Sequence, residues 1–174
     1  MSNIVPEKGI NFSVYLNGRD LLGVAEGNFP NIEMMTSEVK GAGIAGVAES
    51  IVLGHVNSTT VSLTWRNTTK DFAQLLAHKA FDIDMYAAHQ EFDAGLGVYV
   101  VKQIHIFMKA VTKSGNIGNL VVGETTSTQT EHEVYYIKFE INGKEVAEID
   151  KFNYIYKVNG VDYLAEVRVA LGKV

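Results

Sequence analysis

Cysteine is absent from the 174-residue chain. Its absence excludes disulfide bonds, cysteine-ligated zinc sites and thiol nucleophiles together, and it suits a protein that is assembled in a reducing cytoplasm. Positive charge is also scarce, and the formal net charge is −5. Nucleic acid and anionic membranes both bind basic surfaces, so the composition argues against adhesion to either.

Long apolar runs are missing as well. None approaches the roughly 18–20 residues of a membrane span, and the opening segment MSNIVPEKGINF lacks the basic and apolar regions of a signal peptide. We therefore expect a soluble protein that does not bind membranes as a monomer. With 47% hydrophobic and 20% charged residues, the composition predicts one globular domain spanning residues 1–174.

Catalytic motifs are also lacking. The segment Gly41–Gly46 fits G-x-G-x-x-G, but the preceding EMMTSEVK is too polar for a buried strand, and Arg66 stands where the dinucleotide fingerprint needs an acid. The segment Lys40–Val47 is therefore predicted to be a flexible loop of small residues. No G-x-S-x-G, phosphate loop or H-E-x-x-H occurs.

Single titratable residues add little to the case for an enzyme. Asp82 and Asp84 would share one strand face, where solvated charge is a better interpretation than an acid/base pair. The histidines show no metal-binding spacing; they are His55, His78, His89, His105 and His132. The sequence therefore predicts no catalytic, cofactor-binding or metal-binding residues, and no enzyme.

What the chain does contain is hairpin signals. Asn-Gly occurs at Asn17-Gly18, Asn142-Gly143 and Asn159-Gly160, the last two between alternating apolar and polar runs within Glu133–Gly172. A two-residue type I′ turn needs positive φ at both positions, which Asn and Gly tolerate. The sequence therefore predicts long antiparallel ribbons.

Two of the predicted strands are unusually long. The segments Val98–Met108 and Val161–Leu171 would each extend about 36 Å at roughly 3.3 Å per residue. A domain of this size is roughly 40 Å across, so such ribbons would span or leave the body, and their open edges would need partners. Neighbouring copies are natural partners; chance alternation and a bent sandwich strand remain as alternatives.

Further elements follow from local patterns. Alternation at Val61, Leu63 and Trp65 predicts a half-buried strand, and the segment Leu21–Ala25 is predicted to return from the first hairpin turn. The segment Asn28–Lys40 should be extended or irregular, with Pro30 confining any strand to an edge. The polar segment Thr112–Thr130 is predicted to be a long mobile connection.

One helix is expected after Thr68 or Thr69, either of which can cap it. Asp71 lies in its first turn, and Phe72, Leu75, Leu76 and Lys79 follow at helical spacing. The apolar stripe predicts that the helix lies on a sheet, with His78 and Lys79 near its negative C-terminal pole.

Aromatic residues gather near the C-terminus, and they leave two interpretations open. The residues are Tyr135, Tyr136, Phe139, Phe152, Tyr154 and Tyr156. They could form a stacking platform for sugars or single-stranded nucleic acid, or pair across strands. The acidic neighbours Glu133, Glu140, Glu145, Glu148 and Asp150 disfavour nucleic acid. A monomeric β-sandwich that binds carbohydrate or another ligand therefore remains the alternative function.

Three segments resemble one known family, the major tail tube protein of contractile phage tails and of phage-tail-like (R-type) bacteriocins. They are VYLNGRDLLGVAEGNFPNI near the start, VKGAGIAGVAESIVLG with SLTWR in the middle, and FEINGKEVAEIDKFNYIYKVNGVDYL at the end. The resemblance spans nearly the whole chain, and its ends are its most specific parts.

The resemblance implies a mainly β fold: an antiparallel β-sandwich or barrel body, one flanking helix, and long hairpins that join a β-barrel around a hexameric ring. Rings would stack into a tube inside a contractile sheath, in a virion tail or tail-like particle assembled in the bacterial cytoplasm. Implied partners are other copies of the chain, the tail sheath protein, baseplate or hub and tail terminator proteins, and a tape-measure protein in the lumen.

On this hypothesis alternate ribbon side chains, mostly polar or acidic, would line the lumen. DNA would pass without sticking, because like charge removes the counterion release that drives phosphate binding. The Gly41–Gly46 loop and the Thr112–Thr130 connection are the candidate contacts between stacked rings.

Overall fold

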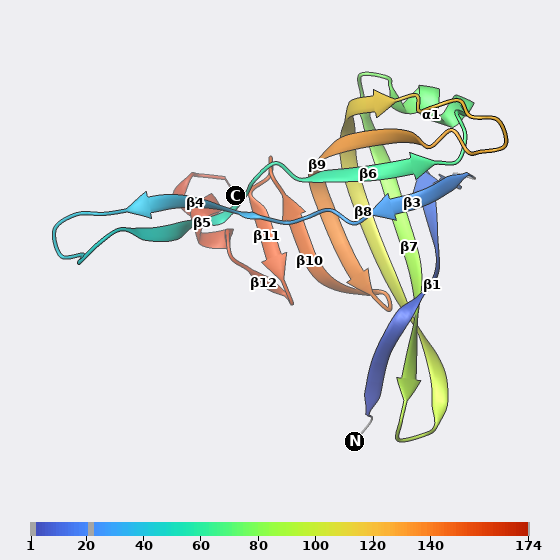
Figure 1. Cartoon of the computed structure of the whole chain (residues 1–174). Helices are drawn as coiled ribbons and strands as arrows, with labels where there is room; N and C mark the ends of the chain where they lie inside the picture. The colour runs from blue at the N-terminus through green and yellow to red at the C-terminus, as the bar shows by residue number, and fades with distance from the viewer. Residues whose placement is uncertain (1–2, 21–22, 174) are drawn as a thin grey trace.

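Antiparallel strands dominate the computed structural model, which describes residues 3–20 and 23–173 (Figure 1). The strands are β1 (Ile4–Leu16), β2 (Arg19–Asp20), β3 (Val24–Asn28), β4 (Met34–Val39), β5 (Ala48–Val56), β6 (Thr60–Trp65), β7 (Ala80–Asp93), β8 (Val98–Asn116), β9 (Thr128–Ile141), β10 (Lys144–Asp150), β11 (Ile155–Val158) and β12 (Val161–Asp162). The helices are α1 (Lys70–Leu75) and α2 (Ala165–Ala170).

The main sheet has the order β12-β11-β10-β9-β8-β7-β1-β2, and β9 has two partners on its other side. The first half of β9 pairs with β6, which in turn pairs with β3, whereas its second half pairs with β10. A bulge lies between the halves, where Tyr135 has no register partner on β8. Because a bulge bends its strand, β6 and β3 cross in front of β7 and β8 as a second layer (Figure 1).

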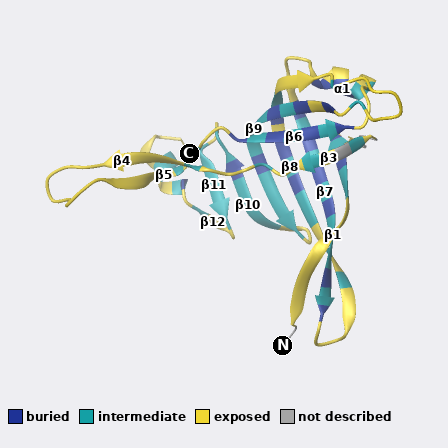
Figure 2. Cartoon of the chain, in the orientation of Figure 1, coloured by how far each residue is buried: buried dark blue, intermediate teal, exposed yellow. Residues whose placement is uncertain are grey.

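The hydrophobic core fills the space between these two layers. Leu63 and Trp65 of β6 face Ile83 and Met108 of the main sheet, and all four are fully buried. Helix α1 closes one end with Phe72 and Leu75, and Thr69 caps it by accepting a hydrogen bond from the N–H of Phe72. Most buried residues lie in this body (Figure 2), and Glu91 and Asp93 are buried on the projecting end of β7.

Two ribbons project from the body and are mostly exposed (Figure 2). One, which we call the arm, is the β4–β5 hairpin. The other consists of the first half of β1 with the adjoining ends of β7 and β8. The main sheet does not close into a barrel within the described part of the chain.

The hairpin turns are confirmed. Both residues of Asn17-Gly18, Asn142-Gly143 and Asn159-Gly160 have positive φ, between 48° and 84°. The long strand at Val98–Met108 is also confirmed and continues to Asn116 as β8. The alternating residues of β6 are buried, as predicted.

The prediction of a long strand at Val161–Leu171 is wrong. Only Val161–Asp162 is strand, and α2 follows as a second, unpredicted helix. Leu164, Val167 and Leu171 also fit helical spacing, and the Ala, Glu and Arg between them favour helix. Asp162 stabilises the transition from β12 to α2 by accepting hydrogen bonds from the backbone N–H of Leu164 (3.0 Å) and from the Arg168 side chain (2.6 Å).

Three further predictions need correction. Helix α1 ends with Leu76 as its C-cap, so His78 and Lys79 lie beyond its C-terminal pole. The return from the first turn is β2; Leu21 and Leu22 lie outside the described residues, and β3 pairs with β6 instead of β1. The connection Thr112–Thr130 is strand at both of its ends, which leaves a shorter loop of residues 117–127.

The base of the arm depends on one glycine. Gly54 of β5 has a φ of +66°, and a Cβ there would lie 2.4 Å from Cγ of the buried Leu164. Gly54→Ala should cost roughly 2 kcal/mol or more, because it adds left-handed strain to a clash. Thermal unfolding should show a loss of roughly 4–8 °C, at about 2–4 °C per kcal/mol for this length.

Gly143→Ala is the matched control for this substitution. Gly143 also has positive φ, +73°, but a Cβ there meets nothing within 4 Å. An equal loss of melting temperature in both variants would show that the contact between Leu164 and the arm contributes nothing.

Candidate assembly surfaces

One face of the main sheet is polar and densely paired. Residues that alternate with the buried ones on β7, β8 and β9 point away from the core, and neighbouring strands continue this face. In the part of the face that adjoins residues 136–141 of β9, the charged members are Asp82, Asp84, His105, Lys109, Lys138, Glu140, Glu145, Glu148, Asp150 and Lys157. Six carboxylates stand against three lysines, so this part of the face is acidic overall.

Ion pairs lie on this face, one within strand β9 and one between β10 and β11. Lys138 contacts Glu140 at 2.7 Å and Lys157 contacts Glu145 at 2.7 Å. The hydrogen bond from Lys138, followed by the one from His105, lowers the pKa of Glu140. These hydrogen bonds therefore favour the ionised form of Glu140.

His105 lies at the centre of the polar face. Its Nε2 is 2.8 Å from Asp84 and its Nδ1 is 2.8 Å from Glu140, and its ring stacks on Tyr86 at 4.1 Å. Ionised carboxylates only accept hydrogen bonds, so both contacts are satisfied together when both ring nitrogens carry protons. Asp84 therefore has a specific partner, and Asp82 contacts Lys109 at 3.9 Å.

The same sheet has two open margins. Strand β1 pairs with β7 along its length, but on its other side it pairs only with β2, at Tyr15 and Leu16. At the far margin β11 pairs with β10 and, through Lys157 and Val158 only, with β12. Within the described residues, most of the β1 margin therefore presents backbone groups that a further strand could pair with. At the far margin the carbonyl of Tyr156 already accepts from the N–H of Tyr163 (2.9 Å), so the open edge there is the short strand β12.

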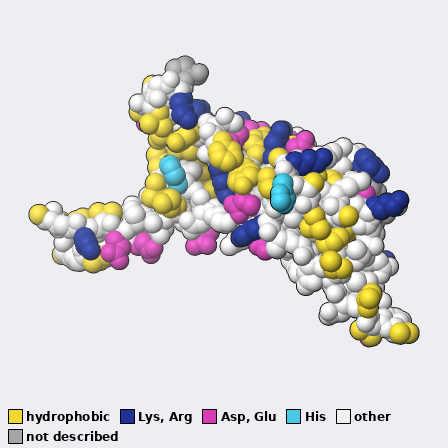
Figure 3. Space-filling model, turned by 90° about the horizontal axis from the view of Figure 1, so that it is seen from above, with side chains coloured by type: hydrophobic (Ala, Val, Ile, Leu, Met, Phe, Trp, Pro, Cys, Tyr) yellow, Lys and Arg dark blue, Asp and Glu magenta, His cyan; other side chains and the backbone are white. Residues whose placement is uncertain are grey.

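The arm pairs only with itself in the described chain. It exposes large apolar side chains: Met35, Val39, Ile44, Val47, Ile51 and Leu53. Figure 3 shows these kinds of side chain along the arm together with acidic ones. An isolated two-stranded hairpin is marginally stable in water, so the arm is suited to lie against another surface. The Gly41–Gly46 loop forms its tip, and β5, not a helix, follows it.

The other residues considered for chemistry form no site. Among residues 3–20 and 23–173, no group of three or more His, Asp or Glu side chains could hold a metal ion. No described helix has both the length and the apolar character that crossing a membrane requires. His132, whose role the sequence did not reveal, is fully buried, and burial lowers its pKa to about 4.

The C-terminal aromatic residues contact several different rings, and they do not share one face. Tyr136 lies on the polar face, with its hydroxyl 2.8 Å from Glu148, whereas Phe139 packs against the core. Tyr135 contacts Phe152, with ring centroids 5.1 Å apart. Cross-strand pairing accounts for this cluster better than a flat stacking platform.

A sheet with one paired polar face, open margins and exposed projecting ribbons is typical of a structural subunit. The chain belongs to the family described as phage tail tube protein FII, whose model matches residues 6–172. It is similar to the tail tube protein of Escherichia phage P2, with 29% identity over 175 residues, covering 97% of this chain and 98% of the relative. It is a structural protein of the virion tail, and not an enzyme.

Proposed function

We propose that six copies of this chain join margin to margin and close their sheets into a continuous β-barrel around a lumen. The observation that carries the proposal is the pair of open margins on opposite sides of one sheet, a long one at β1 and a short one at β12. A head-to-tail contact between two different surfaces closes a ring of identical copies, and closure removes all exposed edges.

In this arrangement the polar face of β7 to β10 lines the lumen. Its carboxylate excess supports an inert channel, because DNA gains no counterion release from a surface of like charge. A tape-measure protein would occupy the same channel before DNA or during assembly.

Stacked rings then form the tube, with the arm and the loop of residues 117–127 as the contacts between rings. The arm supports this role because its apolar side chains are exposed on a ribbon that lacks a second layer. A contractile sheath would surround the tube, with baseplate or hub proteins at one end and a terminator at the other, in a phage tail or a headless bacteriocin.

The first test is cross-linking in a chain that has no native cysteine. Lys8→Cys in β1 combined with Ile155→Cys in β11, treated with a short bismaleimide, should give a ladder of covalent oligomers that ends at six. The pairing of Gln74→Cys in α1 with Ile155→Cys is the control and should give no ladder.

Electron microscopy of the same preparations, with and without sheared tubes as seeds, tests the assembly itself. Hollow tubes are expected. A 19.1 kDa monomer that persists with seeds and binds glycans would overturn the proposal in favour of a ligand-binding module.

A further inference from the structure

The β8–β9 loop, residues 117–127, is held firmly at its base. Thr126 accepts a hydrogen bond from the N–H of Asn119 (3.0 Å) and donates its own N–H to the carbonyl of Arg66 (2.8 Å). The carbonyl of Ile117 accepts from the hydroxyl of Thr128 at 3.0 Å. Gly118, with a φ of +83°, permits this closure, because a Cβ there would lie 2.0 Å from the carbonyl oxygen of Thr126. The loop is therefore fixed in shape.

The tip of this fixed loop is apolar and exposed to solvent. Leu120 is 93% exposed, Val121 54% and Val122 103%. Figure 3 shows apolar side chains capping a protrusion at the lower right, where Figure 1 places this loop beside α1. A rigid loop that exposes three consecutive aliphatic residues marks an interaction site, because binding costs it little conformational entropy.

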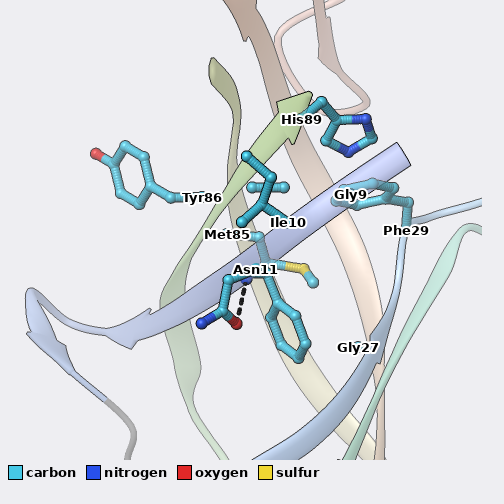
Figure 4. A pocket seen from close by; sticks show the side chains of 10 residues that line it. Gly9, Ile10, Asn11, Gly27, Phe29, Met85, Tyr86 and His89 are labelled. Carbon is cyan, nitrogen blue, oxygen red and sulfur yellow. Dashed lines mark hydrogen bonds between the residues drawn. The ribbon is translucent and has the colours of Figure 1, made fainter. Parts of the chain in front are cut away.

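A recess of matching character lies where the second layer ends. It has a volume of about 360 Å³ and is lined by Phe12, Phe29 and Met85, with Ile10 at its rim. Figure 4 shows Met85 and Phe29 on its walls and Gly27 without a side chain between strands. Phe12 packs against the core cluster and Met85 belongs to it, so the recess is the open mouth of the hydrophobic core.

The two surfaces agree in chemistry and in size. Among the described residues that line the recess, none is a carboxylate, lysine or arginine, and the tip residues are all aliphatic. The three tip side chains contain ten carbon atoms, which fill roughly 300 Å³ if each takes about the 30 Å³ of a water molecule.

We propose that the Leu120–Val122 tip of one copy inserts into the Phe12–Phe29–Met85 recess of a second copy. The inference rests on the proposed function and specifies one of its contacts. A contact between two different surfaces continues from copy to copy, as a stacked tube requires. The tip lies beside α1, whereas the recess lies toward the ribbon formed by β1, β7 and β8. Each copy therefore offers the tip at one end of its body and the recess toward the other end (Figure 1).

The test replaces the tip with polar residues. Leu120→Ser with Val122→Ser should leave monomer folding unchanged, because both side chains are exposed. Each buried aliphatic side chain is worth about tenfold or more in association, so the concentration needed for tube formation should rise at least about 100-fold. Leu120→Met with Val122→Ile is the matched control and should assemble as the wild type does.

Cross-linking identifies the surface that receives the tip. Val121→Cys and Ile10→Cys proteins, mixed and oxidised, should give a heterodimeric disulfide in tubes and none in the monomer fraction. Wild-type tubes without this disulfide, or a serine variant that assembles at the wild-type concentration, would overturn the inference and leave the tube proposal intact. Failure of the wild type to form tubes with seeds would instead overturn both.

Discussion

Acidification from pH 7 to pH 4 is expected to cost the wild-type chain about 3 kcal/mol of folding stability through His132 alone. Burial lowers the pKa of this histidine from 6.5 to about 4. Above pH 6.5 it is neutral in both states, and between pH 6.5 and 4 only the unfolded chain takes up the proton. At 1.36 kcal/mol per pKa unit, the loss reaches about 3 kcal/mol near pH 4.

The hydrogen bonds of His132 explain why it stays neutral. Trp65 donates to the Thr130 hydroxyl (3.4 Å), which can donate to Nε2 of His132 (3.0 Å). On the other side, Nδ1 can donate to the Thr112 hydroxyl (3.1 Å), which donates to the carbonyl of Leu75. When the imidazole ring carries one proton, every donor in this series of hydrogen bonds has an acceptor. A second proton would displace the donor hydrogen of Thr130, in a site with no access to water.

His132→Gln is the variant that tests this account. It should lower stability at pH 7 by about 1 kcal/mol through imperfect hydrogen bonds, and the stability difference from the wild type should shrink or reverse toward pH 4. Urea unfolding at several pH values measures it. His78→Gln, at an exposed histidine, is the control and should follow the wild-type profile. A parallel profile for His132→Gln would contradict the assigned cause.

Shortening the arm should abolish tube formation and leave the monomer folded. Ser37 and Ser50 are Cα partners in the β4–β5 pairing, so a two-residue Asn-Gly turn can join them and remove residues 38–49. The removed residues are mostly exposed and contribute nothing to the core, so the melting temperature should change by only a few degrees. Sedimentation and electron microscopy measure the loss of assembly.

A variant with an arm of full length shows whether assembly depends on the side chains of the arm tip or on the length of the arm. Replacing the tip segment 41–46 with a Gly-Ser segment of equal length keeps both strands and should reduce assembly less than the shortened arm does. A shortened chain that still builds tubes would refute the assigned role, and so would one that fails to fold.

Local sequence signals predicted the fold well wherever one local preference decided the structure. Asn-Gly turns require positive φ at two positions, and few other conformations suit that pair, so all three were predictable. Thr69 and the Phe72/Leu75 stripe located α1 for the same reason. At Leu164–Leu171 the same residues fitted both the strand and the helix periodicity. The hydrogen bond from Leu164 to Asp162, the one from Arg168 to Tyr154, and the contact of Leu164 with Gly54 favour the helix.

The assembly surfaces were predictable only in part. The polar residues of the Thr112–Thr130 segment suggested mobility, whereas long-range hydrogen bonds to residues 66–68 fix the loop. The burial of His132 likewise depends on β6 and α1 covering it, which the alternation within β9 does not reveal. The partners of β1 and β12 at the margins cannot be predicted from the sequence pattern of one copy, because the pattern shows that a strand exists and not which copy pairs with it.

The divided pairing of β9 has a mechanical consequence. Because one continuous strand is hydrogen-bonded first to β6 and then to β10, the covering layer cannot slide over the main sheet without tearing backbone bonds. Two separately stacked sheets would resist such shear by side-chain contacts alone. The wall built from these subunits should therefore be stiff under axial thrust.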